Sequence, residues 1–150
     1  MKLIFIPLLL LIAGCASLVK MDQEYLSKNA SQSFNHSSSS CYKAAKTVIK
    51  DIGGKIQKEK KKKLKFSSNR FHHSRLVTVS ESGSTASEVQ NYHKFYVGVK
   101  GNKSRCVVTI FKYRVWINNQ EANELNENFV KPRVFEPFFN DLKSQLEDTF

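Results

Sequence analysis

Histidines are the side chains of this sequence best suited to acid–base or metal chemistry, and four are present. His72 and His73 are adjacent, whereas His36 and His93 stand alone. Adjacent residues of a strand point to opposite faces, so His72 and His73 are not expected to share a metal ion. Neither belongs to a His-x-x-x-His or Cys-x-x-Cys pattern of the kind that binds zinc. We therefore expect no metal site, and we place His72 and His73 at a solvent-exposed strand end.

Other residue patterns typical of catalysis are equally weak. The serines do not lie in a Gly-x-Ser-x-Gly elbow, and the glycines lack the spacing of a phosphate-binding loop. Glu136, Asp141 and Glu147 could pair for acid–base work, but the sequence puts them on the polar face of a helix. We expect no enzymatic activity and no cofactor.

Cys15 follows a short apolar segment at the start of the chain. The segment has a basic start at Lys2 and small residues at its end, which is the order typical of a secretory signal peptide. It is too short for a membrane-spanning helix, which needs about 20 residues. Ile12-Ala13-Gly14-Cys15 resembles the lipobox of bacterial lipoproteins. This resemblance implies that residues 1–14 are a signal peptide and that Cys15 carries the diacylglyceryl and acyl groups, such as palmitate, of a lipid anchor.

The lipoprotein resemblance also implies a location. Ala16 and Ser17 stand where an aspartate would retain many Gram-negative lipoproteins in the inner membrane, so the outer membrane is favoured, on its periplasmic or its outer side. The formal net charge of +11, to which Lys2 contributes, would ordinarily suggest nucleic acid as a partner. For an exported chain we expect no nucleic acid. Lipid phosphates, acidic glycans and acidic protein surfaces are the anions of an envelope.

The sequence predicts one folded domain over residues 41–150, preceded by a lipidated N-terminus and flexible tether over residues 15–40. Gln23 to Ser40 is rich in Ser, Asn, Gln and Lys and has no sustained apolar period, so it cannot bury enough surface to offset ordering. Apolar residues then recur at helical spacing from Cys41 to Ile52, after Ser40 as a favoured N-cap and before Gly53-Gly54. This pattern predicts an amphipathic helix with Cys41 on its apolar side.

A lysine tract, Lys60, Lys61, Lys62 and Lys63, follows this helix. Ile56 and Gln57 can start one strand, and Leu64 and Phe66 alternate with lysines as a second strand would. The tract therefore falls at or near a turn. It is either a solvated loop or a contact with an anionic surface, to which each lysine near a membrane can contribute about 1 kcal/mol.

The segments 93–100 and 103–118 are the strongest strand candidates, joined by Gly101-Asn102 as a two-residue hairpin turn. That turn would pair Val99 with Ser104, Val97 with Cys106 and Phe95 with Val108. One core face would then hold Phe95, Val97, Val99, Cys106, Val108 and Ile110. The predicted helix over residues 41–52 would then bring Cys41 near Cys106. The two cysteines would form a disulfide bond or remain two buried thiols.

The opposite face of these two paired strands is unexpectedly apolar. Tyr96, Phe111 and Tyr113 align there, while Lys112 and Arg114 fall on the presumed core side. Either a bulge near residues 110–112 exchanges the two faces, which we favour, or the back of the sheet is covered by a partner. Tyr96, Phe111 and Tyr113 are therefore the candidate partner face.

The remaining segments complete the expected fold. The sequence predicts a strand over Arg75–Ser82, polar loops over Glu81–Asn91 and Asn118–Asn128 (the second with at most a weak helical turn), and a last helix that starts around Glu136-Pro137. We expect a two-layer α+β domain, in which an antiparallel sheet of three to five strands carries an N-terminal and a C-terminal helix on one face. This element order is similar to that of BamC-type outer-membrane lipoproteins, without a shared motif.

Taken together, these features predict a non-catalytic, membrane-anchored envelope lipoprotein that binds or scaffolds another envelope component. The first alternative is a binder of anionic lipid or glycan that uses Lys60–Lys63. The second alternative is an envelope hydrolase whose site is assembled only in the folded chain.

Overall fold

The computed structural model describes residues 17–73, 78–82, 85–89 and 91–148. The predicted signal peptide and Cys15 lie outside the described residues. Two long antiparallel strands, β8 (Asn91–Gly101) and β9 (Cys106–Ile117), form the centre of the fold. Both strands alternate between buried and more exposed side chains, as expected for a sheet with one face in the core.

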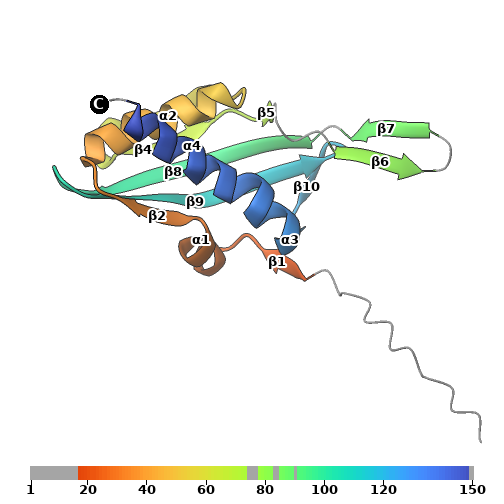
Figure 1. Cartoon of the computed structure of the whole chain (residues 1–150). Coiled ribbons are helices and arrows are strands. Elements are labelled where there is room, and N and C mark those ends of the chain that lie inside the picture. The colour runs from red at the N-terminus through yellow and green to blue at the C-terminus, as the bar shows by residue number, and fades with distance from the viewer. Residues whose placement is uncertain (1–16, 74–77, 83–84, 90, 149–150) are drawn as a thin grey trace, which may run out of the picture.

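Shorter strands extend the sheet on both sides of this central pair (Figure 1). β8 also pairs with β4 and β5, β3 pairs with β4, and β9 also pairs with β2 and β10. The sheet therefore has seven strands, which exceeds the predicted three to five, and its pairs are antiparallel as predicted. The bounds of the shorter strands are β2 (Ser31–Phe34), β3 (Ile56–Lys60), β4 (Lys65–Ser68), β5 (Phe71–His72) and β10 (Gln120–Ala122).

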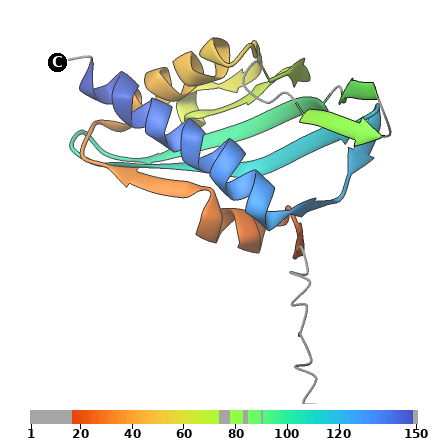
Figure 2. The ribbon, with the colours of Figure 1, turned by 45° about the vertical axis from the view of Figure 1, so that its right-hand side comes forward.

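Helices α2 (Ser38–Asp51) and α4 (Glu136–Glu147) pack on one face of the sheet and confirm the predicted two-layer α+β architecture (Figure 2). The Ser37 side chain accepts a hydrogen bond from the backbone N–H of Ser40, so α2 begins slightly before the predicted cap. Gly53, at a φ of 101°, follows its end. α4 continues a short α3 (Glu127–Val130) and a π-helical turn, η2 (Lys131–Phe135). None of the helices in the described part of the chain has the length and apolar character that crossing a membrane requires.

A β-bulge at Phe111 exchanges the two faces of β9. Tyr96 pairs with Lys112 and Val97 with Ile110, so Phe111 is left without a partner in β8. Beyond the bulge Tyr113 is buried in the core, while Lys112 and Arg114 point to the other side. The predicted bulge is confirmed. The predicted placement of Tyr113 on a partner face is wrong, because the extra residue of the bulge turns the Tyr113 side chain toward the core.

The hairpin between β8 and β9 is longer than predicted. Gly101 pairs with Cys106, and the loop consists of the four residues between them, so Val99 pairs with Val108 rather than with Ser104. The loop is held by Asn102, whose side-chain oxygen accepts hydrogen bonds from the backbone N–H groups of Ser104 and Arg105. The register differs from the predicted one by an even number of residues, so the core face is still the predicted face.

The N-terminal segment is part of the domain, and the tether predicted for residues 15–40 is wrong from Leu18 onward. The segment forms β1 (Leu18–Lys20), α1 (Gln23–Asn29) and β2. β2 pairs with β9, and Ala30 accepts a hydrogen bond from the backbone N–H of Ile110. Leu26, Ala30 and Phe34 are buried. Burial of these three side chains offsets the conformational entropy that this otherwise polar segment loses when it becomes ordered.

Two predicted loops also contain strands. Of the strand predicted over Arg75–Ser82, residues 75–77 lie outside the described residues and the rest forms β6 (Thr78–Ser82). β7 (Thr85–Val89) pairs with β6 inside the segment predicted as a polar loop. In the segment predicted as a loop over residues 118–128, β10 pairs with β9 and β11 (Glu124–Asn126) pairs with β1. Asn118 and Asn119 both have positive φ, which suits a tight hairpin turn between β9 and β10.

Candidate functional site

The outer face of the sheet, which is the face opposite α2 and α4, carries cations and aromatic rings in alternation. Three pairs lie directly across from one another on β8 and β9: Tyr92 with Trp116, Lys94 with Arg114, and Tyr96 with Lys112. Cross-strand partners share a face. Their neighbours along each strand, such as His93 and Val115, are buried. The outer face is therefore built by the same alternation that builds the core.

Cations and rings on this face are in contact. Arg70 lies over both Tyr92 and Trp116, with its guanidinium carbon 4.7 and 4.8 Å from the two ring centroids. The ammonium groups of Lys94 and Lys112 lie 5.4 and 5.3 Å from the ring centroid of Tyr96. Such contacts hold long basic side chains close to the sheet and keep their charges exposed.

The two arginines of the outer face are already paired. Arg114 forms an ion pair with Glu121, and this hydrogen-bonded contact lowers the pKa of the Glu121 carboxyl, which stays ionised. Arg70 donates a hydrogen bond to the side-chain oxygen of Asn119, with an N–O distance of 2.8 Å. The lysines of this face differ, because Lys58, Lys60 and Lys65 form no ion pair with the described acidic residues.

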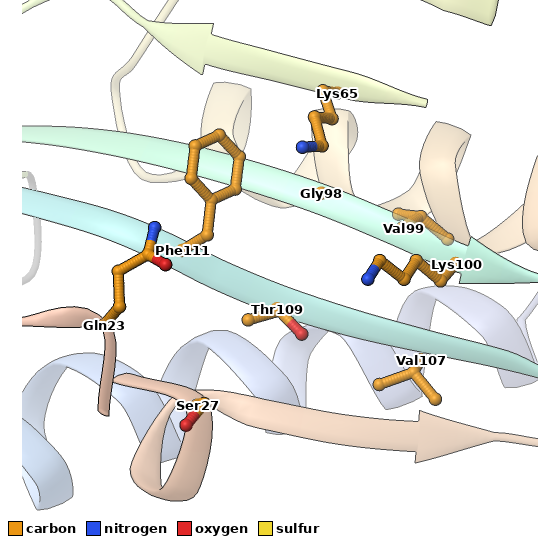
Figure 3. Close-up of a pocket in the computed structure, with 9 residues that line it drawn as sticks. All are labelled: Gln23, Ser27, Lys65, Gly98, Val99, Lys100, Val107, Thr109 and Phe111. Carbon is orange, nitrogen blue, oxygen red and sulfur yellow. The ribbon is translucent and has the colours of Figure 1, made fainter. Parts of the chain in front are cut away.

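Two hollows lie side by side on the outer face and share Lys65 and Phe111. The first, of about 480 Å³, lies between these residues and α1 (Figure 3). The second, of about 330 Å³, lies toward β3. The first is lined by Gln23, Ser27, Lys65, Gly98, Val99, Lys100, Val107, Thr109 and Phe111. The second is lined by Lys58, Lys60, Lys65, Phe66, Ser67, Tyr96 and Phe111.

Phe111 forms the wall between the hollows. Its ring lies on the outer face, where the ammonium group of Lys65 lies 5.1 Å from the ring centroid. Gly98 forms part of the floor of the first hollow, because a Cβ atom at this position would lie 3.4 Å from Phe111 Cδ1 and 3.5 Å from Lys65 Cγ. A larger side chain at residue 98 would fill this space.

The lysine tract lies at the edge of this site. Lys60 ends β3 and lines the second hollow. Lys61, Lys62 and Lys63 form a turn of 3₁₀ helix, η1 (Lys61–Lys63), with exposed side chains, and line neither hollow. The predicted turn between two strands is confirmed. Lys60 therefore belongs to the outer face, whereas Lys61, Lys62 and Lys63 lie beside it in the turn.

Of the predicted partner-face residues, Tyr96 and Phe111 lie on the outer face and Tyr113 does not. Tyr113 is 4% exposed, and its ring lies 5.0 Å from Phe95 and 5.5 Å from Phe135. Its hydroxyl lies 2.6 Å from Nδ1 of His93. Burial raises the pKa of Tyr113, so this hydroxyl stays protonated.

His73 and His93 are buried in the core, so the solvent-exposed strand end predicted for His72 and His73 is wrong for His73. His73 and His93 are 6% and 1% exposed, and their ring centroids are 5.5 Å apart. His72 is half-buried, with its ring centroid 6.2 Å from that of Tyr92. Burial lowers the pKa of His93 to about 3. Within the described residues, no group of three His, Cys, Asp or Glu side chains could hold a metal ion.

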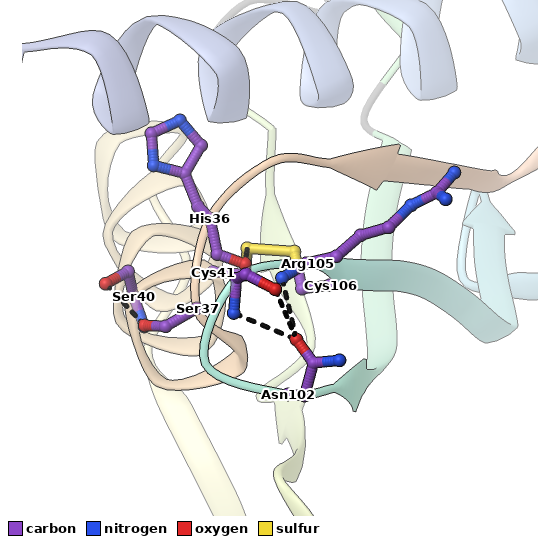
Figure 4. The surroundings of a disulfide bond; sticks show 8 residues. His36, Ser37, Ser40, Cys41, Asn102, Arg105 and Cys106 are labelled. Carbon is purple, nitrogen blue, oxygen red and sulfur yellow. Dashed lines mark hydrogen bonds between the residues drawn. A yellow bond between two sulfur atoms is a disulfide. The ribbon is translucent and has the colours of Figure 1, made fainter.

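Cys41 and Cys106 form a disulfide bond, as one of the two sequence interpretations expected (Figure 4). The bond joins the first turn of α2 to the start of β9, with a Cα–Cα distance of 6.6 Å. Ser38 reinforces the same junction, because its backbone N–H donates to the Asn102 carbonyl oxygen at 2.8 Å. The disulfide fixes α2 against the β8–β9 hairpin at one end of the sheet.

Sequence reasoning missed most of the outer face. Tyr92-x-Lys94-x-Tyr96 and Lys112-x-Arg114-x-Trp116 are alternating patterns that could have indicated it. Without the bulge, a regular alternation along β9 assigns the second pattern to the core face. The positions of Lys65 and Arg70 depend on the order of the strands in the sheet, which local sequence patterns do not determine.

Comparisons with known proteins add little to this geometry. No protein-family model and no curated protein matches the sequence. Among solved structures, the crystal structure of a DUF4468 family protein from Bacteroides ovatus is similar over 78% of this chain and 76% of its own chain, with 15% sequence identity and a TM-score of 0.40. At these values the similarity supports no inference about function.

Proposed function

We propose that this chain is a non-catalytic binding module of a bacterial cell envelope, anchored to a membrane by lipid on Cys15. The outer face of the sheet is its contact surface, and an anionic component of the envelope is its partner. The outer membrane is the favoured location, on the basis of Ala16 and Ser17.

The observation that carries this proposal is a group of lysines around two hollows that form no ion pair with the described acidic residues. Lys58, Lys60 and Lys65 converge there, and Lys65 lies at both hollows. Unpaired cations on one face raise the local concentration of anions and speed their association. Aromatic rings beside them add contact area that does not depend on charge.

The position of the first strand supports a contact close to the membrane. β1 begins at Leu18, three residues after Cys15. Three extended residues span at most about 10 Å. Lipid on Cys15 would therefore hold the domain against the headgroups, rather than at the end of a long tether.

The second candidate is attraction of the lysine tract itself to an anionic lipid or glycan. Its support is the exposure of Lys61, Lys62 and Lys63 in η1. Lysines of this kind attract anions without selecting their shape. The outer face offers both charge and shape, so we prefer it.

A photo-crosslinking amino acid at residue 96, in the lipidated protein in its native cell, tests the proposal. Tyr96 lies on the outer face, whereas Lys143 on α4 is exposed on the opposite side of the domain and serves as the control position. We expect a discrete crosslinked species at residue 96 and none at residue 143. Equal yields at both positions, or no adduct at residue 96, would contradict the proposal.

A further inference from the structure

Resting on the proposed function, we propose that the two hollows bind a linear anionic glycan. Two consecutive sugar rings would occupy the two hollows, one on each side of Phe111. Their carboxylate or phosphate groups would lie at Lys65 and its neighbouring lysines. This names the chemical class of partner that the outer face takes.

The division of the site into two hollows favours a chain of repeated units. Ligand pockets for small molecules typically span 300–1,000 Å³. Here about 480 and 330 Å³ lie in two adjoining spaces with one shared wall. The shared residues, Lys65 and Phe111, would contact both units. A single compact ligand would leave one of the hollows empty.

The lining matches the surface of a charged sugar. A pyranose ring has apolar C–H faces that pack on aromatic rings, hydroxyl groups at its rim and, in an acidic sugar, a charged group. Phe111 and Tyr96 supply aromatic rings, and Gln23 and Ser27 supply an amide and a hydroxyl at the first hollow. The lysines supply the counter-charge. Each feature of the ligand therefore has a matching side chain.

Two other partners fit this site less well. An extended acidic peptide joins a sheet by pairing with an edge strand. The two hollows meet at Lys65 and Phe111, on β4 and β9, which are paired inside the sheet, and the edge strand β3 contributes only Lys58 and Lys60 to the second hollow. Nucleic acid is commonly bound by arginines that contact phosphate with two parallel hydrogen bonds. On this face Arg70 and Arg114 are engaged with Asn119 and Glu121.

The test is a titration of the full chain, purified in detergent, with oligosaccharides of defined charge. Hexagalacturonate offers carboxylates on sugar rings, and a phosphorylated mannose hexasaccharide offers phosphates. Fully methyl-esterified hexagalacturonate keeps the rings without charge, and hexaglutamate keeps the charge without rings. We expect at least one anionic hexasaccharide to bind at least tenfold more tightly than the methyl ester and hexaglutamate. The anionic hexasaccharide that binds more tightly identifies whether the site prefers carboxylate or phosphate.

Three variants locate the binding. Lys65→Gln removes the shared charge, and Gly98→Val fills the floor of the first hollow without changing charge. We expect each to weaken binding at least tenfold. Lys143→Gln, an equal change of charge on α4, should change affinity less than twofold. Thermal unfolding of each variant verifies that it folds, and Lys65→Gln decides the outcome if Gly98→Val does not fold.

The results separate this inference from the proposed function. Equal affinity for hexaglutamate, or no binding of either anionic hexasaccharide, would overturn the glycan inference. The photo-crosslink at residue 96 would still stand in that case and would point to a protein partner. Loss of that crosslink together with loss of glycan binding would overturn both.

Discussion

Phe111 and Tyr113 are two residues apart on β9 yet lie on opposite faces of the sheet. In a regular strand they would share a face, but Phe111 is the extra residue of a bulge. Phe111 therefore stands at the hollows of the outer face, and Tyr113 is buried beside His93. Because of the bulge, Tyr113 completes the core instead of sharing the outer face with Phe111.

Truncation of Tyr113 should therefore damage the fold, whereas truncation of Tyr96 should not. Tyr113→Ala leaves a cavity among Phe95 and Phe135 and removes the partner of His93, so the free energy of unfolding should fall by about 3–5 kcal/mol. Tyr96→Ala, on the outer face, should lower it by less than about 1 kcal/mol. Urea unfolding monitored by circular dichroism measures both. A larger loss for Tyr96→Ala would contradict the placement of the two rings.

The disulfide between Cys41 and Cys106 should contribute strongly to stability. It closes a loop with a sequence separation of 65 residues. The loop-entropy treatment gives roughly 4 kcal/mol for a loop of this length. Replacing both cysteines with alanine should lower the free energy of unfolding by that order, measured by urea titration. The protein purified without reductant should show neither thiol on denaturation, and two titratable thiols would refute the bond.

Buried His93 should make the domain less stable in mild acid. Burial lowers its pKa to about 3, and the neighbouring His73 and His72 act in the same direction. In the unfolded chain a histidine titrates near 6.5. As pH falls from 6.5 toward 3, the unfolded chain therefore takes up a proton that the native state excludes. The free energy of unfolding should fall by about 2 kcal/mol between pH 6.5 and 4.5 through this residue.

The matched variant for this effect is His93→Phe, which also leaves the Tyr113 hydroxyl without its partner. Its stability is expected to be lower at every pH, so only the difference between pH 6.5 and 4.5 is compared. That difference should shrink by about 2 kcal/mol relative to the unchanged chain. An identical pH dependence in both proteins would show that His93 is not the titrating group.

Lipidation of Cys15 is the prediction on which the membrane location depends. Cells that express the chain and are fed an alkyne-tagged palmitate should incorporate label into the mature protein. Cys15→Ser should abolish the label and block cleavage after residue 14, whereas replacement of Cys41 and Cys106 with alanine should leave the label unchanged. Label that persists in Cys15→Ser would exclude the lipobox interpretation.

Local patterns in the sequence predicted much of the fold. The helical spacing from Cys41 to Ile52 corresponds to α2, and the alternation in β8 and β9 indicated the correct core face. The misplaced charges of Lys112 and Arg114 indicated the bulge. Each of these signals lies within a few residues and reflects burial of one face, so no knowledge of distant contacts was needed.

Contacts between distant segments were not predictable in the same way. Phe34 pairs with Cys106 because β2 joins the edge of β9. A Ser- and Gln-rich segment does not have the apolar alternation that predicts such a strand. The helical spacing of Leu26 and Ala30 was the available signal. The predicted hairpin register was wrong for a local reason. The Asn102 side chain accepts hydrogen bonds from the backbone of Ser104 and Arg105, which gives a longer loop than the two-residue turn predicted from Gly101-Asn102.

The most direct test of the contact surface compares two triple variants with the same change of charge. The first replaces three of the lysines at the hollows, Lys58, Lys60 and Lys65, with glutamine, and the second replaces Lys61, Lys62 and Lys63 of η1. The yield of the photo-crosslink at residue 96 is measured in both. If the outer face is the contact surface, the first variant loses the crosslink and the second keeps it. Loss only in the second would mean that the exposed turn makes the contact, and would contradict the role proposed for the outer face.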